Sequence, residues 1–110
     1  MNTETLLKQT TRFRDDLLKD LVDMAFAMYY LEAALLDYKE DGNTEALWIA
    51  LYDVVAAQGG IGKLAERAKV NPEHLNDILA SKPEPRLDNL QNILSGLSFQ
   101  IRLEFTEHNL

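Results

Sequence analysis

Residues 61–79 read IGKLAERAKVNPEHLNDIL, and this stretch decides the predicted fold. Its pattern is typical of two short helices joined by a three-residue turn. The positions expected to face inward are Leu64, Ala65 and Ala68 on the first helix and Leu75, Ile78 and Leu79 on the second. The small side chains of the first helix let the second cross it closely, and Val70 fills the corner between them.

The second of these helices has a well-marked start. Asn71 is a favoured N-cap residue, because its side-chain oxygen accepts a hydrogen bond from a free N–H group of the first turn. Pro72 follows at the first helical position, where its missing N–H has no cost and its φ is already helical. We therefore expect the helix to begin at Pro72.

The segment resembles the DNA-binding helix-turn-helix. That motif has a small residue at the position of Ala65, an apolar one at Val70, and apolar ones at Leu75 and Ile78, and all four match. Two positions depart from the pattern: Lys69 stands where glycine is usual in the turn, and Asp77 stands where a basic residue is frequent.

Residues 13–104 are similar to the addiction-module antidote family, which are lambda-repressor-like, XRE-type regulators also found in prophages. The similarity covers about nine-tenths of the chain. It is carried by Tyr30-Leu31, Ala34-Leu35, Ala46-Leu47, Gly59 to Ala65, Leu75, Leu79, Pro85 to Asp88 and Leu90.

This resemblance implies an all-α, lambda-repressor-like helix-turn-helix bundle. It further implies a cytoplasmic antitoxin or transcriptional regulator that binds operator DNA as a homodimer. Such a protein pairs with a small ribonuclease-type toxin, of the RelE/ParE type. It needs no cofactor, no metal and no catalytic residue.

In a helix-turn-helix the second helix enters the major groove. Its outward residues here are Glu73, His74, Asn76 and Asp77. Asn76 has the geometry for a bidentate contact to adenine, His74 can donate to a base or a phosphate, and a carboxylate such as Asp77 selects a cytosine amino group while repelling phosphate.

Backbone phosphates are expected to meet basic residues beside this helix. Free N–H groups near Gly62, with Lys63, form one contact region, and Lys82 with Arg86 form another beyond the groove. Residues 62–86 hold five basic and four acidic side chains, so the local charge is only +1, and affinity should fall steeply with salt. The complete predicted DNA-contacting set is Gly62, Lys63, Asn71, Glu73, His74, Asn76, Asp77, Lys82 and Arg86.

Upstream, residues 10–39 hold neither glycine nor proline and read as long helix, with a break expected near 20–23. One apolar stripe at helical spacing comprises Leu17, Leu21, Met24, Met28, Leu31, Leu35 and Tyr38, and a second beside it comprises Leu18, Val22, Phe26, Tyr29, Ala33 and Leu36. We expect the first stripe to lie either in the hydrophobic core or in an interface between subunits. The total apolar face is wider than one neighbouring helix needs, which indicates either a partner surface or full coverage within the domain.

We accordingly divide the chain into an N-terminal helical extension, 1–43, and a helix-turn-helix domain, 44–110, which form one compact unit. Helix is expected over 44–58, ended by Gly59-Gly60, and again after a capping box that starts at Asp88.

Residues 98–105 alternate strictly between apolar and polar, which predicts a short C-terminal β-strand. A lone strand leaves its edges unpaired, so it would pair with a second subunit or a partner, or lie flat on the helices with solvated edges. The predicted dimer or partner contacts are Leu21, Met24, Met28, Leu31, Phe99, Ile101 and Leu103.

Composition limits the remaining function classes. The 110 residues carry 11 basic and 18 acidic side chains, a net charge of −7, which argues against a nonspecific nucleic-acid coat. The chain has no cysteine and only two histidines, far apart in sequence, and it lacks a nucleophile–base pair, a phosphate loop and a metal cluster, so an enzyme is not expected. The alternative to a DNA-binding regulator is a protein-interaction module that keeps a degenerate helix-turn-helix without DNA affinity.

Overall fold

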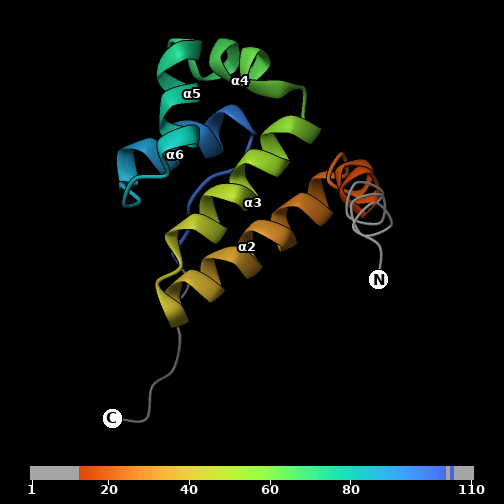
Figure 1. Cartoon of the computed structure of the whole chain (residues 1–110), viewed down its shortest axis with the longest axis vertical. Helices are drawn as coiled ribbons and strands as arrows, with labels where there is room; N and C mark the ends of the chain where they lie inside the picture. The colour runs from red at the N-terminus through yellow and green to blue at the C-terminus, as the bar shows by residue number, and fades with distance from the viewer. Residues whose placement is uncertain (1–12, 104, 106–110) are drawn as a thin grey trace, which may run out of the picture.

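The computed structural model describes residues 13–103 and residue 105, and within them every regular element is helical (Figure 1). Residues 13–20 are helical, a turn follows at 21–23, and five further helices complete the order. They are α2 (Met24–Asp41), α3 (Thr44–Ala57), α4 (Gly60–Ala68), α5 (Pro72–Ser81) and α6 (Leu87–Gly96). The described part of the chain is thus all-α, as predicted, and the expected break near residues 20–23 is confirmed.

The two longest helices, α2 and α3, run side by side in opposite directions (Figure 1). Asp23 caps α2 by accepting a hydrogen bond from the N–H of Phe26 at 3.1 Å. Gly42 ends α2 in the left-handed conformation, at φ 68°, which glycine adopts without a steric penalty. Asn43 then caps α3 through the N–H of Ala46 at 3.0 Å. Gly42 and Asn43, two residue types that favour turns and helix caps, thus form the connection between α2 and α3.

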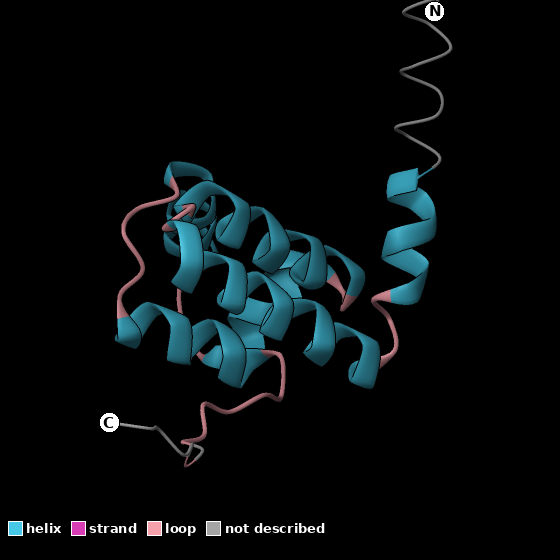
Figure 2. Cartoon of the chain, turned by 90° about the horizontal axis from the view of Figure 1, so that it is seen from below, coloured by secondary structure: helices cyan, strands magenta, loops and turns pink. Residues whose placement is uncertain are grey.

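The helices α4, α5 and α6 lie on the side of α3 opposite α2 (Figure 1), and the described residues form only helices and loops (Figure 2). Gly96 of α6 lies directly against α4, because a Cβ at this position would overlap the side chain of Leu64 and come within 3.2 Å of its carbonyl oxygen. A glycine is required at this crossing, and it fixes how closely α6 packs on α4.

One continuous core joins both halves of the chain. Trp48 is fully buried at its centre, and its indole N–H donates to the carbonyl oxygen of Pro83 at 2.6 Å. Leu21 and Ala27 from the N-terminal region are equally buried. The Gln58 side-chain amide also holds the turn at 21–23, donating to the carbonyl oxygens of Leu21 and Val22 at 2.7 and 3.0 Å.

The face of α2 that enters the core differs from the predicted stripe. Leu31 of that stripe is buried, but Met24, Met28 and Leu35 are 41%, 38% and 40% exposed. The core-facing side instead carries Ala27, Tyr30, Leu31, Ala34 and Tyr38. Since small residues let two helix axes approach closely, the alanines favour this face over the methionines.

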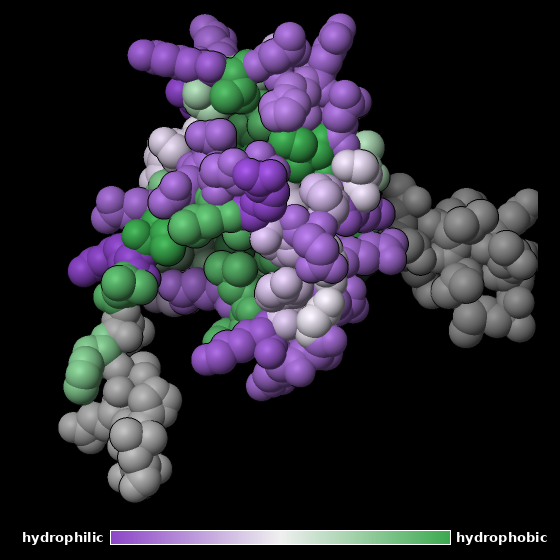
Figure 3. Space-filling view, turned by 90° about the vertical axis from the view of Figure 1, so that its left-hand side faces the viewer, coloured by the Kyte–Doolittle hydropathy of each residue, from purple (hydrophilic) through white to green (hydrophobic). Residues whose placement is uncertain are grey.

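The predicted C-terminal β-strand does not form in the described residues. Residues 99–103 and 105 have no regular secondary structure, and only Phe99 of this alternating run packs against the core. Leu103 and Phe105 are 99% and 91% exposed, and Figure 3 shows this end of the chain projecting from the body of the molecule. The physical reason is that a strand needs a neighbouring strand to pair with, and the other described elements are all helices.

The start of α6 also differs from prediction. Arg86, not Asp88, occupies the N-cap position, and Asp88 lies in the first turn.

None of the described helices is both long and apolar enough to span a membrane.

Candidate nucleic-acid interface

The α4–turn–α5 unit has the geometry expected from the sequence. Lys69 ends α4 in the left-handed conformation, with φ 58° and ψ 44°, where a non-glycine residue is strained. The N–H of Val70 donates back to Ala65 at 3.1 Å, which closes the turn. Asn71 then accepts from the N–H of Glu73 at 2.7 Å, and Pro72 is the first residue of α5, so both predictions for this helix start are confirmed.

The outer side of α5 is polar and exposed. Its buried positions are Leu75, Ile78 and Leu79, and its exposed ones include Glu73, His74, Asn76 and Asp77. Glu73 and Asp77 lie one turn apart on the middle of the exposed face, with Asn76 on one side and His74 on the other. The site therefore offers two hydrogen-bond acceptors, flanked by an amide and an imidazole, to anything that docks on α5.

The first turn of α4 provides a second feature, beside α5. Gly59 stands at its N-cap with no side-chain hydrogen bond, so the first N–H groups of the helix are free to bind another acceptor. The aliphatic part of Lys63 folds over Gly59, because a Cβ there would lie 2.5 Å from Lys63 Cδ. Gly62 and Lys63 are both exposed. The helix dipole and the lysine charge thus coincide at this end of α4.

The two basic residues that follow α5 are engaged within the chain. Lys82 Nζ lies 3.4 Å from a carboxylate oxygen of Glu45, and the Arg86 guanidinium makes two contacts with Asp88, at 3.2 and 3.1 Å. A hydrogen bond from the N–H of Asn89, together with Arg86, lowers the pKa of Asp88. These pairings reduce the positive charge that Lys82 and Arg86 offer to a phosphate.

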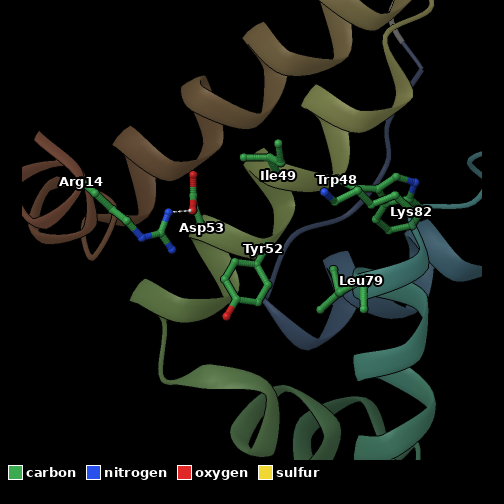
Figure 4. A pocket seen from close by; sticks show the side chains of 8 residues that line it. Arg14, Trp48, Ile49, Tyr52, Asp53, Leu79 and Lys82 are labelled. Carbon is green, nitrogen blue, oxygen red and sulfur yellow. Dashed lines mark hydrogen bonds and ion pairs between the residues drawn. The ribbon is translucent and has the colours of Figure 1, made fainter. Parts of the chain in front are cut away.

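A pocket of about 380 Å³ opens between α3 and the end of α5 (Figure 4). Its walls are Arg14, Trp48, Ile49, Tyr52, Asp53, Leu79, Ala80 and Lys82. Asp53 is 3% exposed, and its carboxylate accepts from the Arg14 guanidinium at 2.5 Å and from the Tyr30 hydroxyl at 3.4 Å. The same guanidinium lies 5.9 Å from the centre of the Tyr52 ring.

This buried carboxylate has a structural role. Burial, followed by the negative charge of Asp53 and its hydrogen bond, raises the pKa of Tyr30. Because Asp53 accepts hydrogen bonds from Arg14 and Tyr30, it connects the helical segment 13–20 and α2 to α3. Sequence reasoning missed this cluster, although Asp53 is a lone charge within the apolar run 46–57 and was a visible signal.

The predicted dimer or partner residues divide into two groups. Leu21 and Leu31 are core residues of the chain itself, at 0% and 4% exposed. Met24 and Met28 are partly exposed on α2, Phe99 is half-buried, and Ile101 and Leu103 are exposed. Only the exposed members are accessible to a second molecule.

Comparison of the chain with protein-family models, curated proteins and solved structures finds no match. Functional inference therefore rests on the geometry above and on the residue pattern of the helix-turn-helix.

Proposed function

We propose that this protein is a sequence-specific DNA-binding regulator with a lambda-repressor-like fold, in which α5 is the reading helix. The observation that carries the proposal is the two-sided character of α5. Leu75, Ile78 and Leu79 fix one side in the core, and the other side presents Glu73, His74, Asn76 and Asp77 to solvent. A helix held in this way can enter a major groove without rearranging.

The contacts follow from the positions of the side chains. Asn76 pairs with an adenine edge, His74 donates to a base or a phosphate, and the carboxylates of Glu73 and Asp77 accept from cytosine amino groups. The free N–H groups of α4 and the Lys63 charge bind one backbone phosphate. The protein acts by occupying its operator as a homodimer, and the resemblance to the antidote family supports an antitoxin role beside a ribonuclease-type toxin.

A second candidate is a protein-interaction module that retains the helix-turn-helix scaffold without DNA affinity. A specific observation favours it: Glu73 and Asp77 lie at the centre of the exposed α5 face, while Lys82 and Arg86 are paired with Glu45 and Asp88. Carboxylates at this place repel the phosphates on both sides of a groove.

Fluorescence anisotropy with duplex DNA from upstream of the gene, and with a scrambled duplex, separates the two candidates. For a regulator, Asn76→Ala should weaken specific binding by about 1–3 kcal/mol, and the matched change Asn92→Ala on α6 should not. Asp77→Asn should strengthen binding to the scrambled duplex, because it removes a repulsion from phosphates, and it should narrow the difference between the two duplexes, because it weakens the acceptor for a cytosine amino group. Equal and negligible affinity of the protein and of Asp77→Asn for both duplexes would favour the interaction module.

A further inference from the structure

An apolar surface on α2 faces away from the core and is not covered by any described residue. Its members are Phe26, Tyr29, Ala33 and Leu36, which repeat at helical spacing, and we call them the outer face of α2. Phe26, Tyr29 and Leu36 are 42%, 65% and 62% exposed. This face is distinct from the edge that carries Met24, Met28 and Leu35, because Glu32 and Lys39 lie between the two.

Carboxylates surround the outer face. On the helical projection, Glu32 lies along one side of it, Asp37 along the other, and Glu40 lies one turn beyond Leu36. All three are exposed, and none forms an ion pair within the described residues. Residues 13–41 hold three basic and eight acidic side chains, a net charge of −5 out of the −7 of the whole chain. Within α2 itself the count is one basic and four acidic side chains, a net charge of −3, so the apolar surface lies on a negatively charged helix.

We propose that the outer face of α2 is a docking site for a partner protein segment that presents apolar side chains between lysines and arginines. Charge complementarity identifies the partner: it must bring positive charge to Glu32, Asp37 and Glu40, and apolar side chains to Tyr29 and Leu36. Complementary potentials also speed association at low ionic strength.

Two considerations argue against a second copy of this chain as the occupant. Two copies would bring their carboxylates together, and like charges at an interface oppose association. The area is also small: the exposed parts of Phe26, Tyr29 and Leu36 amount to roughly 340 Å², taking about 200 Å² for each side chain. A stable dimer of standard size buries about 800 Å² on each side, whereas one helix or strand is covered by less.

This docking site does not depend on DNA binding. The outer face points away from α3, and α5 packs on α3 on the side opposite α2. A variant can therefore lose DNA binding and keep partner binding, or the reverse. A DNA-binding regulator with this second surface would take a basic protein partner while its reading helix is occupied.

The test uses a fluorescent synthetic amphipathic helix of leucine and lysine, as long as α2, and a matched helix of leucine and glutamate. We expect the lysine helix to bind the full chain and the glutamate helix not to bind. Leu36→Ser should weaken this binding roughly tenfold or more, since it removes an apolar anchor. Leu87→Ser on α6 is the matched control, because Leu87 is also 62% exposed, and it should leave the affinity unchanged.

A second arm tests the charge. Glu32→Gln combined with Asp37→Asn should weaken binding of the lysine helix, whereas Glu66→Gln with Glu84→Gln should not. Equal effects of Leu36→Ser and Leu87→Ser would overturn the proposal. Self-association of the protein that is abolished by Leu36→Ser in sedimentation equilibrium would also overturn it, by assigning the face to a second copy.

Discussion

Removal of Arg14 should destabilise the protein because it leaves the Asp53 carboxylate buried without a full counter-charge. Breaking a buried ion pair from one side costs about 3–5 kcal/mol. Here Asp53 is 4% exposed at its side chain but Arg14 is 43% exposed, so solvent already screens part of the attraction. We therefore expect Arg14→Ala to lower the free energy of unfolding by about 2 kcal/mol. For a chain of this size that is a fall in Tm of about 8–16 °C.

Urea unfolding at neutral pH, followed by far-UV circular dichroism, measures this loss. Lys19→Ala is the matched control on the same helical segment, and as an exposed residue it should change stability by less than about 0.5 kcal/mol. The double variant Arg14→Ala/Asp53→Asn should be more stable than Arg14→Ala alone, because the carboxamide carries no charge that needs compensation. If Arg14→Ala matched Lys19→Ala, or if the two single changes were simply additive, the reasoning would be refuted.

Three further changes test other parts of the structure. The raised pKa of Tyr30 means that its stabilising effect is present below the ordinary tyrosine pKa and is lost as the pH rises through the folded value. Tyr30→Phe should therefore reduce the stability loss above about pH 10 in urea titrations. Gly96→Ala should destabilise by about 1–3 kcal/mol through its collision with Leu64, and an increase in Tm would contradict the close crossing. Lys69→Gly should stabilise by about 0.5–1 kcal/mol by relieving the left-handed backbone, and an unchanged midpoint in urea would show that the turn is unstrained.

The local signals in the sequence predicted the start of α5 and the break before α2, but not the start of α6. Gly42, Asn43, Asn71 and Pro72 each act on backbone groups within a few residues, so their effect is readable without knowledge of the tertiary structure. At Lys69 the sequence left two alternatives, a strained left-handed residue or a turn built differently, and the structure has the left-handed one.

Contacts between distant residues were not predictable in the same way. The ion pair between Arg14 and Asp53 joins positions 39 apart, and the pair between Lys82 and Glu45 joins positions 37 apart. Nothing in the residue pattern near Lys82 indicates that a carboxylate on α3 will reach it. The prediction that Lys82 contacts a phosphate therefore did not take into account that Glu45 partly neutralises the charge of Lys82 in the folded protein.

The alternating run at 98–105 shows a different limit. Alternation establishes which side chains share a face if the segment is extended, but a strand also needs a neighbour with free backbone groups. Phe99 and Ile101 belong to one such face, yet only Phe99 packs against the core. The alternation of apolar and polar residues alone was therefore insufficient to predict a strand at 98–105.

The predicted stripe of α2 enters the core only in part, and the way α2 packs also explains its exposed surface. Apolar residues occur on nearly every side of α2, so hydrophobicity does not select which side packs against α3. Side-chain size does: Ala27 and Ala34 permit close approach of the two helix axes, and a stripe of methionines would hold them apart. Once the alanine side is buried, Tyr29 and Leu36 must point to solvent, because residues on opposite sides of a helix cannot both enter one core. Their exposure is therefore a consequence of how α2 packs. The fold of the single chain does not require these two exposed positions to be apolar.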